Sequence, residues 1–315
     1  MYINGLSEYL PERVVDNQYF SEKTGREPEW FEARTGMRER RRAAPGENAS
    51  TMAVEAVERL RTSLPNGLGK VDLILGGSYT PWDTLATMAH VVQRKFDLQD
   101  ARALYISSAC SSFLNAIELA AAYFDSGRSK NALIVMSEHN SLYCKDEDFK
   151  AGHLWGDGAA AMLLSKEKTP DTFMEILDVT TAGLGHLGVG PEGVYLAVKG
   201  EGLVMPNGRD VFQHACRAME DLSRQMLSKH QLAVSDVRLL VAHQANGRII
   251  NHVADTLGLT SDQVANTVTT LGNTGCASVP ISLYRYRHML RSGDYVLLVA
   301  FGGGYSSGAA LARVI

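Results

Sequence analysis

Short apolar runs alternate with amphipathic stretches along most of the chain. The apolar runs, each long enough for one buried strand, are residues 71–76, 104–106, 132–137, 239–242 and 295–300. The stretches between them that carry apolar residues at helical spacing are 51–64, 112–125, 211–229, 245–257 and 279–290. This alternation predicts an α/β fold in which helices cover a buried sheet.

The two halves of the chain repeat the same order of patterns. In each half a helical stretch leads to an apolar run with a polar end (VDLILGGSYTP, VRLLVAHQANG), and a second apolar run follows later. A length of 315 residues suits about two domains. We therefore expect an internal duplication, with one unit at 1–168 and a second at 169–315, joined through the polar stretch SKEKTPDT.

Charge and composition exclude several classes of protein. The chain has 31 Lys plus Arg against 35 Asp plus Glu, a net charge of −4. We therefore expect no nucleic-acid partner. No apolar run approaches the roughly 18 residues that span a membrane, and the first residues lack a cationic opening and an apolar segment, so we expect no membrane partner and a cytoplasmic location. The four cysteines are widely spaced and predict neither a disulfide framework nor a metal site.

Cys110 lies in SSACSSF, between an apolar run and a helical stretch. This order places its thiol at a helix N-terminus, where free N–H groups and the helix dipole lower a thiol pKa and favour a nucleophile. The alternative is a buried structural cysteine.

His243 follows an apolar run in VAHQANGR, and Asn273 lies between two glycines in TLGNTGCAS. Alone, each has an ordinary structural explanation, a buried histidine or a turn asparagine. Together with Cys110 they supply a thiol, an imidazole and an amide donor, the groups that acyl-thioester chemistry uses. The glycine run that includes Gly303 lets a backbone N–H approach a ligand and serve as an oxyanion donor, or makes a tight turn.

Two other motifs carry weaker signals. Gly183, Gly185 and Gly188 match GxGxxG, but Pro191 and Gly193 follow where a dinucleotide site needs a helix. We therefore interpret 183–193 as a loop. Basic clusters occur at residues 34–42 and 285–287, either as a solvated face or as a site for a phosphorylated ligand.

Six segments in order resemble β-ketoacyl-ACP synthase III, a family of thiolase-fold condensing enzymes. They are RTGMRER, SSACSSF, WGDGAAA, VAHQAN, LGNTGCASVP and FGGGYSSG. The resemblance implies a five-layer αβαβα sandwich of two duplicated halves and a homodimer whose strands pair across the interface. It implies no cofactor and no metal, with acyl-CoA and malonyl-acyl carrier protein (malonyl-ACP) as substrates.

The resemblance also implies roles for individual residues. Cys110 would take the acyl group from acyl-CoA, with the oxyanion near the N–H groups of Cys110 and Gly303. His243 and Asn273 would bind the malonyl thioester, and Phe301 would form an apolar wall near the departing carboxylate. The product would be a 3-oxoacyl-ACP.

The CoA entrance would use Trp30, Arg34 and Arg248. Here the likeness is incomplete, because the family's second adenine-flanking arginine has Lys150 in its place, which lacks the planar stacking surface of arginine. In the stretch TPWDTLATMAHVVQ, Ala86 matches a phenylalanine that closes the acyl pocket across the dimer in short-chain enzymes. We therefore expect room for a medium-length primer of about eight carbons, unless Trp82, Leu85 or Met88 fills the space.

Three other interpretations remain open. A diverged family member would condense or transfer acyl groups in secondary metabolism. A degradative thiolase would carry a second cysteine in the C-terminal glycine motif, which reads FGGGY here. A non-catalytic acyl-binding dimer subunit would need none of the three reactive side chains.

Overall fold

One nine-stranded sheet organises the chain. The computed structural model describes residues 1–197, 200 and 202–315. The strands of the sheet follow the order β11-β12-β13-β8-β1-β7-β6-β4-β5. Their bounds are β1 Tyr2–Tyr9, β4 Leu73–Gly77, β5 Arg102–Ile106, β6 Asn131–Glu138, β7 Gly158–Ser165, β8 Met174–Gly183, β11 Val237–Ala242, β12 Tyr295–Gly302 and β13 Ser306–Val314.

The sheet has two parts that meet only at one end of β1. Strands β1, β4, β5, β6 and β7 come from the first part of the chain, and β8, β11, β12 and β13 from the second. The two parts are joined by two residue pairs between β1 and β8, Tyr2 with Glu175 and Ile3 with Met174. The connection from β7 to β8 spans the polar stretch in which we placed the boundary. The division into units 1–168 and 169–315 stays a prediction.

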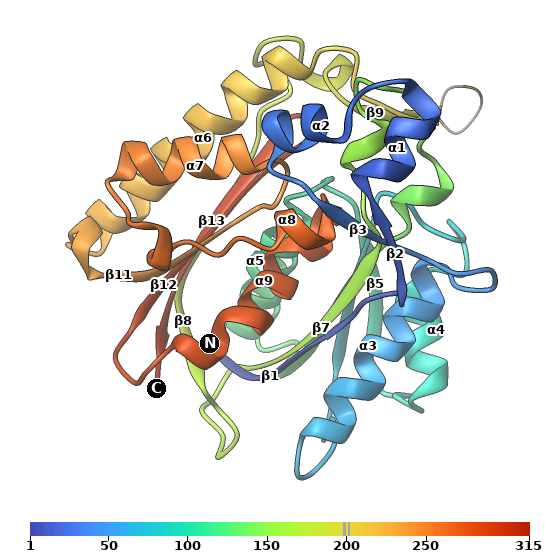
Figure 1. Ribbon diagram of the computed structural model, residues 1–315. Helices are drawn as coiled ribbons and strands as arrows, with labels where there is room; N and C mark the ends of the chain where they lie inside the picture. The colour runs from blue at the N-terminus through green and yellow to red at the C-terminus, as the bar shows by residue number, and fades with distance from the viewer. Residues whose placement is uncertain (198–199, 201) are drawn as a thin grey trace.

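The larger helices form three layers around the two parts of the sheet. Their bounds are α3 Ala49–Ser63, α4 Met88–Lys95, α5 Ser112–Asp125, α6 Gly208–Lys229, α7 Gly247–Leu257 and α9 Ser278–Tyr286. Helix α5 contacts β4 and β6 on one side and β8 and β13 on the other, and α9 contacts strands of both parts. Both helices lie in the middle of Figure 1, with α3 and α4 beyond one part of the sheet and α6 and α7 beyond the other. The predicted five-layer α/β sandwich is therefore confirmed.

Burial explains why the strands read as apolar runs. Every residue of β4 and of β7 is buried, and so is every residue of β12 after the first, because helices cover both faces of the sheet. The middle helix α5 buries apolar side chains towards both parts of the sheet, among them Phe113, Ile117 and Phe124.

Each predicted strand and helix is present, with small shifts at the ends. The helix predicted at 245–257 begins at Gly247, because the Asn246 side chain accepts the Arg248 backbone N–H as an N-cap. The helix predicted at 279–290 ends as an α-helix at Tyr286 and continues as one 3-10 turn. Four strands of the sheet, β1, β7, β8 and β13, lie outside the apolar runs that predict strands. The loop prediction at 183–193 holds, since β8 ends at Gly183 and a 3-10 turn at Gly190–Glu192 follows.

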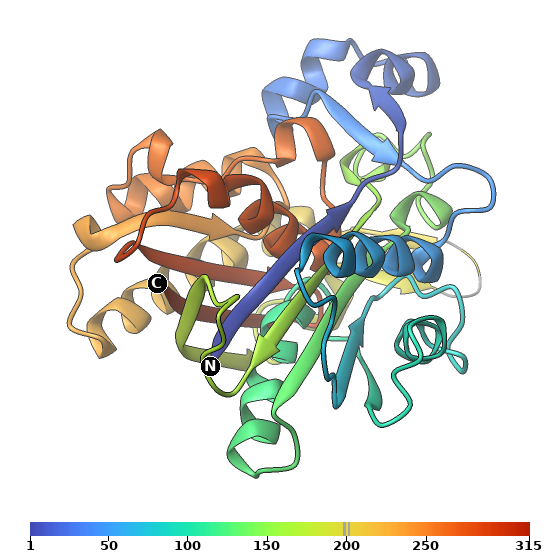
Figure 2. The same ribbon diagram turned by 90° about the horizontal axis from the view of Figure 1, so that it is seen from below.

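The remaining elements are shorter. They are β2 Arg13–Asp16, α1 Asn17–Thr24, α2 Pro28–Thr35, β3 Glu39–Arg42, β9 Tyr195–Ala197, β10 Gly202–Val204 and α8 Val268–Leu271. Figure 2 shows α1, α2 and the hairpin of β2 and β3 together at one end, in blue. No helix in the described part of the chain combines the length and apolar character needed to cross a membrane.

Candidate functional site

Cys110 occupies a tight turn between β5 and α5. The preceding residue, Ala109, has a φ of 48°, a left-handed conformation that a residue with a side chain rarely adopts. Serine side chains hold the turn in place. The Ser112 hydroxyl donates to the Ala109 carbonyl (2.6 Å), and the Ser111 hydroxyl donates to the Ser108 carbonyl (2.9 Å). The thiol is thus fixed at the start of α5, as the sequence predicts.

The glycine turn after β12 packs directly against Cys110. A Cβ on Gly302 would lie 2.6 Å from the Cys110 backbone nitrogen, so only glycine fits there. Ser306, at the start of β13, ties the two segments together. Its hydroxyl donates to the Ser108 carbonyl (2.8 Å), and its oxygen lies 2.9 Å from the Ser111 hydroxyl oxygen. This contact brings Gly303 beside the thiol.

The environment of the Cys110 thiol favours its neutral form. Burial, and secondarily the Glu138 carboxylate, raises the pKa of Cys110 to about 12. The backbone groups of Gly303 and Cys110 and the Tyr79 hydroxyl lower this pKa by less. The expectation that the helix N-terminus lowers the thiol pKa is therefore wrong for the resting protein, because burial outweighs the stabilising groups.

His243 follows the last residue of β11 and is 2% exposed. Its Nδ1 lies 2.7 Å from the Ser278 hydroxyl oxygen, which also accepts the Gln244 backbone N–H (3.2 Å). The Ser278 hydroxyl can donate its hydrogen to Nδ1, and in that tautomer the ring proton lies on Nε2. Burial lowers the pKa of His243 to about 3, so the imidazole is neutral near pH 7.

Asn273 lies between α8 and the 3-10 turn at Gly275–Ala277. Its Oδ1 accepts the Gly275 backbone N–H (2.9 Å). A backbone N–H can only donate, so its partner must be the carboxamide oxygen and not the NH₂ group. This contact fixes the orientation of the carboxamide and leaves the NH₂ group free for a ligand. The backbone is held from both sides, because the Asn273 N–H donates to the Leu154 carbonyl (2.8 Å) and its carbonyl accepts the Gly156 N–H (3.0 Å).

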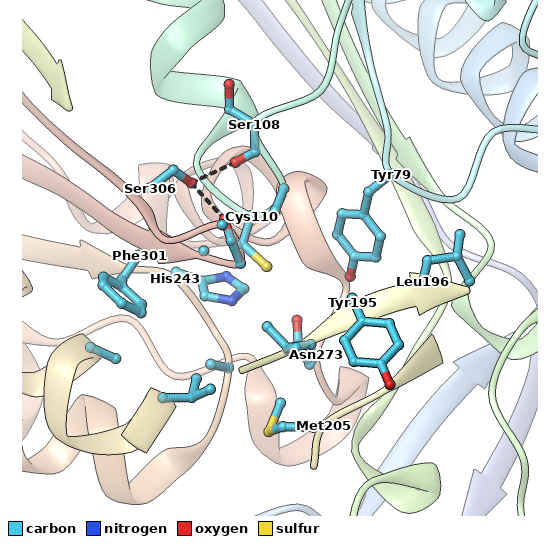
Figure 3. A pocket seen from close by; sticks show the side chains of 18 of the residues that line it. Tyr79, Ser108, Cys110, Tyr195, Leu196, Met205, His243, Asn273, Phe301 and Ser306 are labelled. Carbon is cyan, nitrogen blue, oxygen red and sulfur yellow. Dashed lines mark hydrogen bonds between the residues drawn. The ribbon is translucent and has the colours of Figure 1, made fainter. Parts of the chain in front are cut away.

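Cys110, His243 and Asn273 line one cavity of about 450 Å³, although they come from three distant segments. Figure 3 shows the three side chains around one space, with Phe301 beyond His243 and Tyr79 on the opposite side of the cysteine. Phe301 and Gly303 also line this cavity, as expected. Strands β5, β11 and β12 all end here, at the edge of the sheet where α/β proteins usually bind ligands.

A second cavity of about 550 Å³ shares Met205 with the first. It is lined by all four residues expected at the CoA entrance, Trp30, Arg34, Lys150 and Arg248. The Arg34 guanidinium lies over the Trp30 ring, 4.5 Å from the ring centroid. The structure thus brings these four residues together next to the Cys110 cavity.

Ala86 is the one expected site residue that lies elsewhere. It is exposed and is not part of the lining of the Cys110 cavity within this chain. Its neighbours Trp82 and Leu85 are also exposed, at 61% and 88%. The expected role of Ala86 requires a second chain, so it stays a prediction.

Sequence reasoning missed three residues at this site. Tyr79 and Trp155 line the cavity, and Ser278 holds His243. Tyr79 lies in VDLILGGSYTP, which indicated the internal duplication, and Ser278 lies in LGNTGCASVP, which carries part of the family resemblance. A polar residue directly after a predicted strand was the available signal for Tyr79. In the described part of the chain, no three His, Cys, Asp or Glu side chains are placed to hold a metal ion.

Comparison with known proteins identifies the family. A family described as 3-Oxoacyl-[acyl-carrier-protein (ACP)] synthase III matches residues 104–183, and the C-terminal family of the same name matches 227–314. A beta-ketoacyl-[acyl-carrier-protein] synthase III of Nitratidesulfovibrio vulgaris is 35% identical over 99% of this chain and 98% of its own length. The chain belongs to the β-ketoacyl-ACP synthase III family.

Solved structures agree with this assignment. The 3-oxoacyl-[acyl-carrier-protein] synthase III of Aquifex aeolicus has a TM-score of 0.92 and 32% identity, and the match covers 99% of each chain. The priming β-ketosynthase of the R1128 polyketide biosynthetic pathway has a TM-score of 0.90 and 27% identity, covering all of this chain and 96% of its own. One of these structural neighbours is thus named for a polyketide pathway.

The two buried groups predict the pH dependence of thiol reactivity. Alkylation of Cys110 by iodoacetamide, followed by peptide mapping, should accelerate about tenfold per pH unit through pH 9, because the thiolate fraction rises until the pH reaches a pKa of about 12. His243, with a pKa of about 3, should add no titration step near pH 6.5 to the alkylation rate of Cys110. A small reference thiol should level off above its pKa of about 8.5. A plateau for Cys110 above pH 7 would reveal a thiolate–imidazolium pair and contradict this account.

Proposed function

We propose that this chain catalyses the decarboxylative Claisen condensation of an acyl-CoA primer with malonyl-ACP, giving a 3-oxoacyl-ACP through an acyl group on Cys110. The observation that carries the proposal is the shared cavity of Cys110, His243 and Asn273. A thiol, a neutral imidazole and a fixed amide donor around one space suit thioester chemistry. Membership of the β-ketoacyl-ACP synthase III family supports the same reaction.

The first half-reaction transfers the primer. The Cys110 sulfur attacks the thioester carbonyl, the carbon–sulfur bond to CoA breaks, and CoA leaves as its thiol with the proton that Cys110 gives up. The backbone N–H groups of Cys110 and Gly303 lie beside the sulfur and suit the oxyanion that forms. Because the resting thiol is neutral, deprotonation is part of the barrier to acyl transfer.

The second half-reaction forms the new carbon–carbon bond. The malonyl group loses CO₂, and the electron pair left behind becomes an enolate on the thioester. The His243 Nε2–H and the Asn273 NH₂ group donate hydrogen bonds to the enolate oxygen, and Phe301 gives the departing carboxylate an apolar wall. The enolate carbon then attacks the acyl group, and the Cys110 sulfur leaves as the thiolate and takes up a proton from water, since its first proton left with CoA.

The second cavity is proposed as the CoA and carrier entrance. Trp30 and Arg34 suit the adenine and phosphates, and Arg248 and Lys150 add positive charge on the other side. Met205, which the two cavities share, marks where the pantetheine arm would reach Cys110. CoA and phosphopantetheine thioesters are then substrates, and the reaction needs no further cofactor.

We also propose the homodimer that the resemblance implies. Strand β5 is an edge of the nine-stranded sheet, so one row of its backbone hydrogen-bonding groups lacks a neighbouring strand in this chain. Exposed Trp82 and Leu85 lie in the segment between β4 and α4. A second copy that adds its own β5 would pair the edge and cover such side chains. A cytoplasmic location stays a prediction.

A role in a specialised pathway remains a second candidate. The likeness to the priming β-ketosynthase of the R1128 polyketide pathway favours it, because that structure covers the whole chain. The chemistry at Cys110 would be the same, and the difference would lie in the primer and the carrier protein.

Separate substitutions should divide the two half-reactions. His243→Ala and Asn273→Ala should each lower the condensation rate about 10²- to 10³-fold and leave acyl transfer to Cys110 largely intact, since each removes one donor to the enolate. Cys110→Ala should abolish labelling by acyl-CoA. The measurements are intact mass after acyl-CoA, then CO₂ release after malonyl-ACP.

Two exposed residues of α7 provide matched controls. His252→Ala and Asn251→Ala remove the same side-chain types away from the cavity and should leave both rates unchanged. Stoichiometric labelling of Cys110→Ala, or CO₂ release by His243→Ala at the original rate, would contradict the proposed mechanism.

Primer length is a further part of the proposal. The small Ala86 and the mostly apolar lining, which includes Val194, Leu196 and Leu203, suit an extended alkyl chain. Octanoyl-CoA should label Cys110 at least as fast as acetyl-CoA in a mass-spectrometric time course. A strong preference for acetyl-CoA would contradict the proposed medium-length primer.

A further inference from the structure

Two buried donors in the Cys110 cavity make no hydrogen bond of ordinary geometry in the described part of the chain, although the Tyr79 hydroxyl lies near the Cys110 thiol and the Asn140 carboxamide. They are the Tyr79 hydroxyl and the Trp155 indole N–H, and both residues line the cavity. A buried polar group without a partner is rare in folded proteins and costs stability, so its presence calls for an explanation. A ligand that fills the cavity is one source of the missing acceptor.

Tyr79 is held rigidly in its position. It follows β4, and its backbone N–H donates to the Glu138 carboxylate (3.3 Å), which also accepts the Ser78 hydroxyl (2.8 Å). Its ring lies against Gly275, where a Cβ would be 2.5 Å from the tyrosine oxygen. Gly275 has a φ of 56° and is held by Asn273. The fold therefore keeps the Tyr79 hydroxyl at the wall of the cavity.

The Tyr79 hydroxyl lies where the first carbons of a primer would be. Figure 3 shows three sides around Cys110: Met205 on one, Phe301 on another, and Tyr79 with Leu196 on the third. The pantetheine arm of the proposed reaction passes Met205, and the malonyl carboxylate lies towards Phe301. The side of Tyr79 and Leu196 remains for the acyl chain.

We infer that the Tyr79 hydroxyl selects acyl primers that carry a hydrogen-bond-accepting oxygen on the third carbon of the chain. The inference rests on the proposed function, since it assigns the substrate class of that reaction. In the proposed acyl-enzyme the thioester oxygen would lie at the N–H groups of Cys110 and Gly303, and the Tyr79 hydroxyl, which lies close to the Cys110 sulfur, would face the carbons that follow. Burial keeps the tyrosine pKa well above 10, so the hydroxyl is a donor at neutral pH.

The Tyr79 hydroxyl should discriminate against plain alkyl primers and not only accept oxygenated ones. A plain alkyl chain would leave the buried hydroxyl unpaired and without water, whereas a 3-hydroxyacyl or 3-oxoacyl chain would pair with it. The competing explanation is a water that joins Tyr79 to the buried Asn140 carboxamide oxygen, which also lacks a partner.

Single-turnover acylation of Cys110 without malonyl-ACP tests the inference. The probes are 3-hydroxyoctanoyl-CoA, as each enantiomer, and octanoyl-CoA, and the readout is the ratio of their labelling rates by intact mass. We expect one hydroxyacyl enantiomer to react at least tenfold faster than octanoyl-CoA. Tyr79→Phe should lower this ratio about tenfold or more, because it removes the hydroxyl that pairs with the hydroxyacyl chain and keeps the ring.

Tyr195→Phe is the matched control. Tyr195 lines the same cavity but is 40% exposed, so its hydroxyl is not trapped without water, and the ratio should not change. A ratio near one in the unchanged protein, or an unaltered ratio in Tyr79→Phe, would overturn the inference and leave the proposed function standing. Absence of labelling by every CoA thioester would instead overturn both.

Discussion

The site depends on the close approach of two backbone segments at Gly302. The glycine turn after β12 lies against the N-terminus of α5, and a single Cβ at Gly302 would meet the Cys110 backbone nitrogen at 2.6 Å. Because no side chain separates the two segments, the Gly303 N–H lies beside the Cys110 sulfur. The hydroxyls of Ser111 and Ser306 fasten the contact. In the proposed reaction, a nucleophile that follows β5 at one edge of the sheet would thereby gain an oxyanion donor that follows β12 near the other edge.

The same arrangement explains the electrostatics of the cavity. Packing the thiol between two parts of the sheet shields it from much of the water, which raises its pKa, and burial also keeps His243 neutral. A neutral imidazole with its proton on Nε2 is a hydrogen-bond donor and carries no charge that would trap a carboxylate. Asn273 is likewise held as a donor by the Gly275 N–H. The cavity therefore stabilises negative charge that forms during a reaction better than it stabilises a resting thiolate.

The sequence predicts the layered fold well. Strands covered on both faces appear as apolar runs, and the helices between them carry apolar residues at regular helical spacing. The sequence does not identify β7, whose GAAAMLLS suits a helix or a strand, and β8 alternates too weakly to stand out. Pairing with β1 and β6 on either side decides the conformation of β7. Such pairing is a tertiary property that local sequence does not express.

The reactive side chains were recognisable from their segments, and the structure brings Cys110, His243 and Asn273 together. The direction of the Cys110 pKa shift was not predictable, because a helix N-terminus is visible in sequence whereas the depth of burial is not. Tyr79, Trp155 and Ser278 were missed for a related reason: each matters through contacts with segments far away in the chain. Ser278 is itself recognisable only as the start of a helix until its contact with His243 is seen.

A crystal structure of the protein after reaction with octanoyl-CoA tests the account most directly. The proposed mechanism predicts a thioester on the Cys110 sulfur. Its carbonyl oxygen should lie between the N–H groups of Cys110 and Gly303, and its chain should run towards Tyr79 and Leu196. An acyl group on another residue, or a carbonyl oxygen turned towards His243 and Asn273, would contradict it.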